Sequence, residues 1–105
     1  MRGYQRTFIA GLILPLLAIT AFGADQAVVD LYKSRCQGCH GAGGKGTIAG
    51  RKWGAMPFQD PEVRRMSLPD LVKIIKDGKN KMPRYNGKLT DDQIKEMAKY
   101  INELK

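Results

Sequence analysis

The stretch Cys36-Gln37-Gly38-Cys39-His40 contains both cysteines and the single histidine of this 105-residue chain. The strongest metal- and cofactor-binding side chains are therefore gathered in five positions. The chain lacks the residues for several other kinds of site. One histidine cannot build a two-histidine metal centre, two cysteines cannot form several disulfides, and a Ser-His-Asp triad would need this same histidine.

The spacing of these residues fits C-x-x-C-H, the attachment signature of c-type haem. Cys36 and Cys39 lie near the end of an expected helix, where two thiols reach the two vinyl groups on one edge of a porphyrin and become thioethers. The next residue, His40, is then directed under the iron as its proximal ligand. The sequence predicts one covalently attached haem c.

Three other roles for the cysteines fit less well. A thioredoxin-like redox pair needs a βαβ context, which the sequence lacks. A zinc site needs further soft ligands, and no other Cys or His is present. A disulfide between Cys36 and Cys39 would close a loop too short to stabilise the fold much.

The second axial ligand is expected to be a methionine, because the histidine is already used and thioether sulfur is the usual partner in electron-carrying cytochromes. Met97 lies on an apolar helical stripe and fits the core better, and Met66 lacks supporting context. Met56 and Met82 each precede a proline, which stiffens the loop. We favour Met82, which lies between two capped helices, and keep Met56 as the alternative.

The N-terminus has the pattern of a signal peptide over residues 1–23. Arg2 and Arg6 form a basic start, and the apolar run that follows is short for a membrane span. Cleavage is expected after Gly23 or Ala24, with a retained membrane anchor as the alternative. Export would place the domain in the periplasm, without stable membrane insertion. Loss of two arginines lowers the net charge from +8 to +6.

The remaining domain, residues 24–105, is expected to be all-α. Apolar residues recur at helical spacing in three stretches, and typical cap residues bound them. Thr90 and Gln93 form the clearest signal, a capping box. The three main helices are expected over about Asp25–Gln37, Ser67–Gly78 and Thr90–Leu104. The glycine-rich stretch Gly38–Met66 shows no helical or strand pattern, and a loop of that length is unusual unless it wraps something.

With these residues identified, the domain resembles the small bacterial class I cytochromes c over nearly its full length. The resemblance is carried by Tyr32, the haem motif with Gly41, the glycine-rich stretch to Gly50, Leu71–Lys76 with Gly78, Met82-Pro83, Leu89–Ile94 and Tyr100-Ile101. It implies a cytochrome c-like fold in which the first and last helices cross, with Tyr32 meeting Tyr100 or Ile101. It also implies that His40 and Met82 bind the iron from opposite faces.

The sequence departs from this family at two places. The family often has a small residue, commonly glycine, at the helix crossing, whereas Val28 stands four residues before Tyr32. Many members also have a proline after the haem motif whose carbonyl accepts a hydrogen bond from the proximal histidine. Residues 41–48 contain no proline, so the residue that orients His40 is not identified from the sequence.

Further haem contacts are expected from Trp53, Arg51 and Tyr85, which could donate hydrogen bonds to the haem propionates. The alternative is that Trp53 packs under the long loop and Arg51 is solvated. Residues 73–88, around Met82, carry six basic and one acidic side chain. We expect Lys79, Lys81 and Arg84 to form a docking face for redox proteins with acidic surfaces. A solvated helix face without a docking role is the alternative.

The resulting functional hypothesis is an exported electron carrier that passes single electrons between redox partners, as in a respiratory chain. The protein is expected to be a monomer and not to bind nucleic acid. Nucleic-acid binding is disfavoured because the few aromatic residues are not interleaved with the charges. The alternative is a haem-based sensor or small-ligand-binding protein with a labile Met82. An enzyme is not expected, because two protein ligands fill both axial positions and no distal histidine exists.

Overall fold

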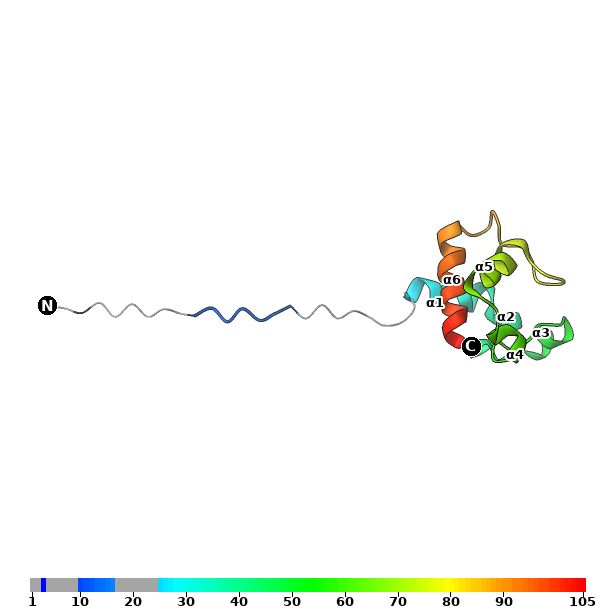
Figure 1. Cartoon of the computed structure of the whole chain (residues 1–105), viewed down its shortest axis with the longest axis horizontal. Helices are drawn as coiled ribbons and strands as arrows, with labels where there is room; N and C mark the ends of the chain where they lie inside the picture. The colour runs from blue at the N-terminus through cyan, green and yellow to red at the C-terminus, as the bar shows by residue number, and fades with distance from the viewer. Residues whose placement is uncertain (1–2, 4–9, 17–24) are drawn as a thin grey trace.

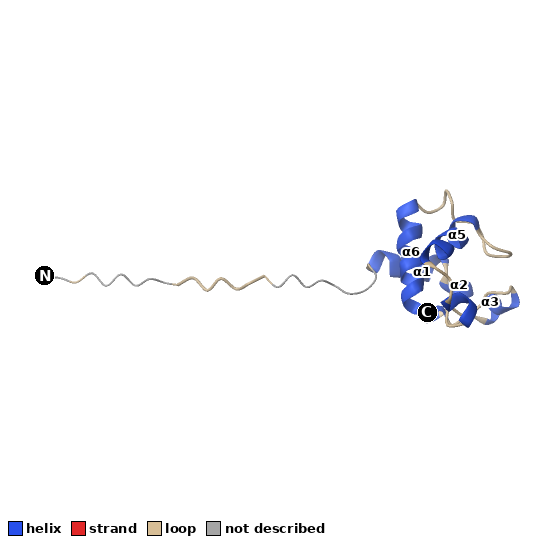
Figure 2. Ribbon diagram, in the orientation of Figure 1, coloured by secondary structure: helices blue, strands red, loops and turns tan. Residues whose placement is uncertain are grey.

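The structure is a computed structural model, and it describes residue 3, residues 10–16 and residues 25–105. In this part of the chain helices are the only extended regular elements, and the β pairing is limited to two isolated bridges (Figure 2). The all-α expectation is confirmed. In chain order the helices are α1 (Gln26–Arg35), α2 (Gln37–His40), the 3₁₀ helix η1 (Ala42–Gly44), α3 (Ile48–Lys52), α4 (Pro61–Arg64), α5 (Leu68–Asp77) and α6 (Asp91–Leu104).

The three long helices begin at the cap residues that the sequence predicts. The Asp25 carboxylate accepts a hydrogen bond from the backbone of α1. Ser67 and Thr90 each form a reciprocal capping box, with Asp70 and Gln93 respectively. Such boxes satisfy two backbone N–H groups that the first helical turn otherwise leaves without partners. The starts of α5 and α6 are therefore fixed by local chemistry.

Two expectations about helix boundaries are wrong. The first helix ends at Arg35 rather than Gln37, because Cys36 adopts a φ of −117° and separates α1 from α2. The stretch Gly38–Met66 is not structureless, since α2, η1, α3 and α4 lie in it. These elements have only three to five residues, and helices that short show no apolar periodicity in a sequence.

The core lies where α6 packs against α1 and α5 (Figure 1). The stripe predicted on α6 is buried and includes Met97, as expected. Tyr32 of α1 meets Tyr100 of α6 edge to face, with ring centroids 5.4 Å apart, so the expected contact at the helix crossing is confirmed. The buried apolar residues are Val28, Tyr32, Phe58, Val63, Leu71, Ile75, Ile94, Met97, Ala98 and Ile101.

The predicted cleavage sites after Gly23 and Ala24 lie outside the described residues. Residues 10–16 belong to no helix or strand, and their side chains are exposed. Among the described residues, none of the helices has both the length and the apolar character that a membrane crossing requires.

Candidate functional site

The C-x-x-C-H residues lie on the single turn of α2 and the joint that precedes it. Cys36 is the cap between α1 and α2, and its carbonyl accepts a 2.9 Å hydrogen bond from the backbone N–H of His40. Both cysteines are free and partly buried. Burial raises the pKa of the Cys36 thiol to about 11. Redox-active cysteines instead have a lowered pKa, so this environment argues against the thioredoxin-like alternative.

The His40 ring is held beside Phe58, with ring centroids 5.0 Å apart. Its Nδ1 atom is buried and has no hydrogen-bond partner among the described residues. Burial also lowers the pKa of the imidazole, which favours the neutral form that can donate a lone pair. A buried nitrogen without a partner is rare in native proteins. The site therefore fits a bound group, and two free thiols beside a neutral imidazole fit haem c.

The backbone around α2 is fixed by residues that the sequence analysis missed. The Thr47 hydroxyl donates to the carbonyls of Gly38, at 2.9 Å, and Cys39, at 3.2 Å, and accepts the N–H of Gly50. Gly50 lies so close to the Cys39 carbonyl that a Cβ atom there would overlap it. These contacts connect α3 to α2, and no local sequence signal indicates them.

Met82 lies in a loop that is fixed at both ends. Lys79 and Met82 exchange two backbone hydrogen bonds around a tight turn in which Asn80 has a φ of 53°. Gly78 has a φ of 77°, and a Cβ there would lie 2.7 Å from the Met82 carbonyl oxygen. Met82 is partly buried against the core, whereas Met56 is 39% exposed. The choice of Met82 over Met56 as the axial ligand stays a prediction.

Of the three candidate propionate contacts, Arg51 and Trp53 lie together on α3 and at its end, and Tyr85 lies on a different segment. The Tyr85 hydroxyl donates to the carbonyl of Arg35 at 3.1 Å, so a hydrogen bond from it to a propionate would replace that contact. The Arg51 guanidinium donates to the carbonyl of Lys45 at 3.4 Å. Trp53, which follows α3, is 56% exposed. Their roles toward haem stay predictions.

The basic residues around Met82 reach solvent. Lys79, Lys81 and Arg84 are exposed. The Lys88 ammonium lies 5.9 Å from the centre of the Tyr85 ring, within the range of a cation–π interaction. The loop that carries Met82 therefore presents positive charge to solvent.

A short helix with two free thiols and a histidine, packed under crossed terminal helices, defines a small monohaem c-type cytochrome of class I. The model of the family described as "Cytochrome C oxidase, cbb3-type, subunit III" matches residues 23–101, and the chain belongs to that family.

Relatives and solved structures agree with this assignment. Cytochrome c6 of Thermosynechococcus vestitus is 30% identical, over 89% of this chain and 82% of the relative. Cytochrome c-555 of Methylococcus capsulatus is 30% identical, over 92% of this chain and 80% of the relative. The structure of the "KustC0563 c-type cytochrome" matches with a TM-score of 0.68 and 29% identity, over 72% of this chain and 94% of that one.

Membership of this family implies one covalently attached haem c, and the two cysteines of the C-x-x-C-H sequence agree with it. The protein is an electron-transfer cytochrome and not an enzyme.

Proposed function

We propose that the protein is an exported carrier of single electrons in which Cys36 and Cys39 hold the haem as thioethers. His40 and Met82 occupy the two axial positions. When bound, haem c supplies an iron that cycles between two oxidation states. With both iron ligands supplied by the chain, electrons would pass while small molecules would find no open coordination site.

The observation that carries this proposal is the fixed position of Met82. Its loop returns to α5 through hydrogen bonds from the backbone of Tyr85 and Asn86 to the carbonyls of Ile75 and Lys76, at 3.0 and 3.1 Å. A ligand on a braced loop keeps its position when the iron changes its oxidation state. Small reorganisation of this kind suits electron transfer better than sensing, which needs a ligand that leaves.

The matched variants Met82→Ala and Met56→Ala test the axial ligand. In the oxidised holoprotein, Met82→Ala should abolish the sulfur-to-iron charge-transfer band, and Met56→Ala should leave it unchanged. The reduced wild-type protein should bind CO poorly, and reduced Met82→Ala should bind it readily. Ready CO binding by the wild-type protein would favour the sensor hypothesis instead.

Export and partner choice are part of the same proposal. Mass spectrometry of the protein isolated from cells should show an N-terminus at Ala24 or Asp25, and a chain that retains residues 1–23 would contradict export. Lys79, Lys81 and Arg84 are proposed to guide acidic redox proteins to the haem. Replacing all three with glutamine should slow electron transfer to an acidic partner at low salt, and added salt should remove the difference.

A further inference from the structure

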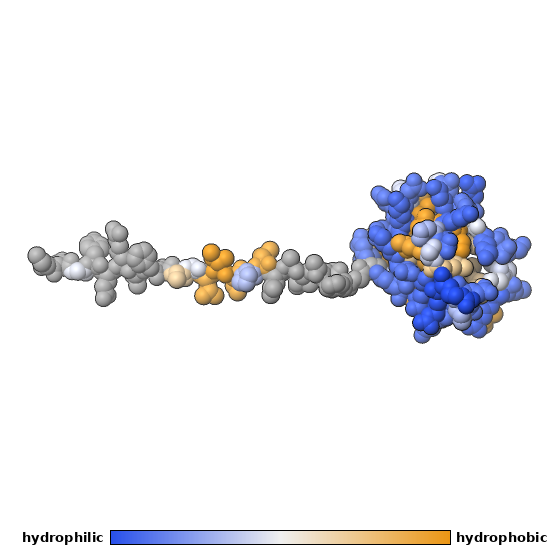
Figure 3. All heavy atoms as spheres, viewed as in Figure 1, coloured by the Kyte–Doolittle hydropathy of each residue, from blue (hydrophilic) through white to orange (hydrophobic). Residues whose placement is uncertain are grey.

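A groove runs between α5 and α6, and its lining includes none of the residues of the haem-binding motif and neither Met82 nor Met56. Its volume is about 470 Å³, and all of its lining residues belong to these two helices. Leu68, Pro69 and Val72 of α5 provide its apolar surface. Leu68 and Val72 remain partly exposed although they pack against the core. Figure 3 shows apolar side chains at the surface of the domain over α5 and α6, surrounded by hydrophilic ones.

The border of the groove is strongly positive. Lys73 and Lys76 of α5 face Lys95 and Lys99 of α6 across it, with Asp77 as the one acidic residue that lines it. Lys76 pairs with Asp91 at 3.7 Å, and Lys99 pairs with Glu96 at 3.1 Å. Among the described residues, no carboxylate lies within 4.0 Å of the Lys73 or Lys95 ammonium. Lys73 still acts on Asp70, since hydrogen bonds with Ser67 chiefly lower the pKa of that carboxyl and the charge of Lys73 lowers it further.

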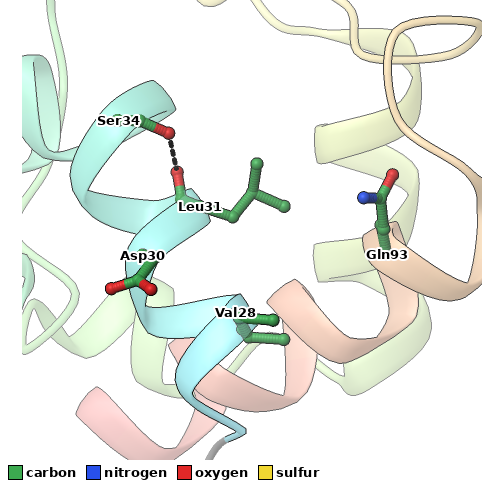
Figure 4. A pocket seen from close by; sticks show the side chains of 6 residues that line it. Val28, Asp30, Leu31, Ser34 and Gln93 are labelled. Carbon is green, nitrogen blue, oxygen red and sulfur yellow. Dashed lines mark hydrogen bonds between the residues drawn. The ribbon is translucent and has the colours of Figure 1, made fainter.

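A second hollow, of about 390 Å³ between α1 and α6, provides a contrast. Figure 4 shows Val28 and Leu31 pointing toward the α6 side while Asp30 points away. Its polar groups are already used: the Ser34 hydroxyl donates to the Leu31 carbonyl, and Gln93 caps α6. This hollow has no border of one charge.

We propose that the groove between α5 and α6 binds an acidic amphipathic segment of a protein partner. Its apolar side chains would cover Leu68 and Val72, and its carboxylates would pair with Lys73 and Lys95. Burial of the apolar surface would supply the affinity, and the lysines would select for negative charge. A concave apolar surface bordered by lysines fits a segment that inserts into it better than the flat surface of an anionic membrane. The partner would thus be held at a surface separate from the haem-binding residues.

Titration of the isotope-labelled holoprotein, followed by NMR, tests this proposal. The probe is a short helical peptide with a leucine face bordered by glutamates, and a peptide with lysines in place of the glutamates is its control. The acidic peptide should shift the amide signals of α5 and α6, and the basic peptide should not. Lys73→Glu with Lys95→Glu should weaken binding of the acidic peptide about tenfold, because two attractive pairs become repulsive.

The control variant, Lys33→Glu with Lys52→Glu, makes the same change in net charge on exposed residues of α1 and α3. The control variant should weaken binding of the acidic peptide by less than about threefold, because salt screens charges that lie far from the groove. Equal losses in the two variants, shifts centred on residues 79–84, or no binding would overturn the proposal. Binding to phosphatidylglycerol vesicles through the groove, without binding of the peptide, would overturn it in favour of a membrane.

Discussion

The hydroxyl of Tyr32 donates a 2.6 Å hydrogen bond to the carbonyl of Gly41, the residue that follows His40. Tyr32 is 1% exposed and also packs edge to face on Tyr100. One side chain of α1 therefore fixes the end of the haem-binding turn and the position of α6. His40, the proposed proximal ligand, is thus followed by a residue that is held by the same side chain that organises the crossing of the terminal helices.

Replacing Tyr32 with phenylalanine should lower the free energy of unfolding of the holoprotein by about 0.5–1.5 kcal/mol, because the buried Gly41 carbonyl would lose this hydrogen bond and keep only the one from the N–H of Gly44. Denaturant unfolding measures this change. Tyr100→Phe is the matched control, since no hydrogen bond joins its hydroxyl to a described residue, and it should change stability little. Equal losses in the two variants would show that the hydrogen bond to Gly41 has no special role.

The same tyrosine should make stability depend on alkaline pH. Burial, chiefly, raises the pKa of Tyr32 from 10.0 to about 12. Below pH 10 the phenol is protonated in both the folded and the unfolded state, and its contribution to the free energy of unfolding is fully present. Between about pH 10 and 12 only the unfolded chain ionises, so stability falls with rising pH by up to about 1.4 kcal/mol per pH unit.

The difference in unfolding free energy between wild type and Tyr32→Phe isolates this contribution from that of the other groups that titrate at high pH. It should be constant below pH 10 and fall steadily as the pH approaches 12. A difference that stays constant up to pH 12 would contradict the raised pKa.

The parts of the fold that follow from local chemistry could be predicted from the sequence. Ser67 and Thr90 cap α5 and α6 because a side-chain oxygen and a nearby N–H group suffice. The stripe on α6 follows from its 3.6-residue period. The haem motif was recognisable because thioether attachment demands a fixed spacing. In each case the atoms that interact lie within one or two helical turns.

The parts that depend on tertiary contact could not be predicted in this way. Phe58 lies beside His40 although eighteen positions separate them. Thr47 binds the carbonyls of α2, and Gly50 is required only because another segment passes close to it. The Tyr85 hydroxyl donates to the carbonyl of Arg35, fifty positions earlier in the chain. Residue type and spacing do not show which distant segments of the chain pack against each other.

Gly50→Ala should damage the haem site. A Cβ atom at this position would overlap the Cys39 carbonyl, so α3 and α2 would have to separate. We expect a loss of about 3 kcal/mol in stability and a lower yield of attached haem. Gly38→Ala is the control, because a Cβ there meets nothing within 4 Å, and it should attach haem normally. Absorbance at the Soret maximum relative to total protein measures the yield, and equal yields would contradict the steric argument.

Gly78→Ala should displace the loop that carries Met82. The substitution strains a backbone with a φ of 77° and places a Cβ 2.7 Å from the Met82 carbonyl oxygen. Gly87→Ala separates the two effects, because Gly87 has a φ of 83° but its Cβ would meet nothing within 4 Å. Both variants should lose about 1–2 kcal/mol from strain. Only Gly78→Ala should weaken the sulfur-to-iron band, and an unchanged band would disprove steric support of Met82 by Gly78.

Removal of the haem should unfold most of the domain. Apart from α1, α5 and α6, the helices of the described residues have at most five residues, and isolated helices of ten to fourteen residues are marginal in water. Among the described residues, ten side chains form the buried apolar core, and none hydrogen-bonds the buried Nδ1 of His40. Cys36→Ala with Cys39→Ala should therefore show little helical signal in far-ultraviolet circular dichroism. Met82→Ala, which retains both thioethers, should keep most of that signal. A native-like spectrum from the double cysteine variant would show that the polypeptide alone organises the core.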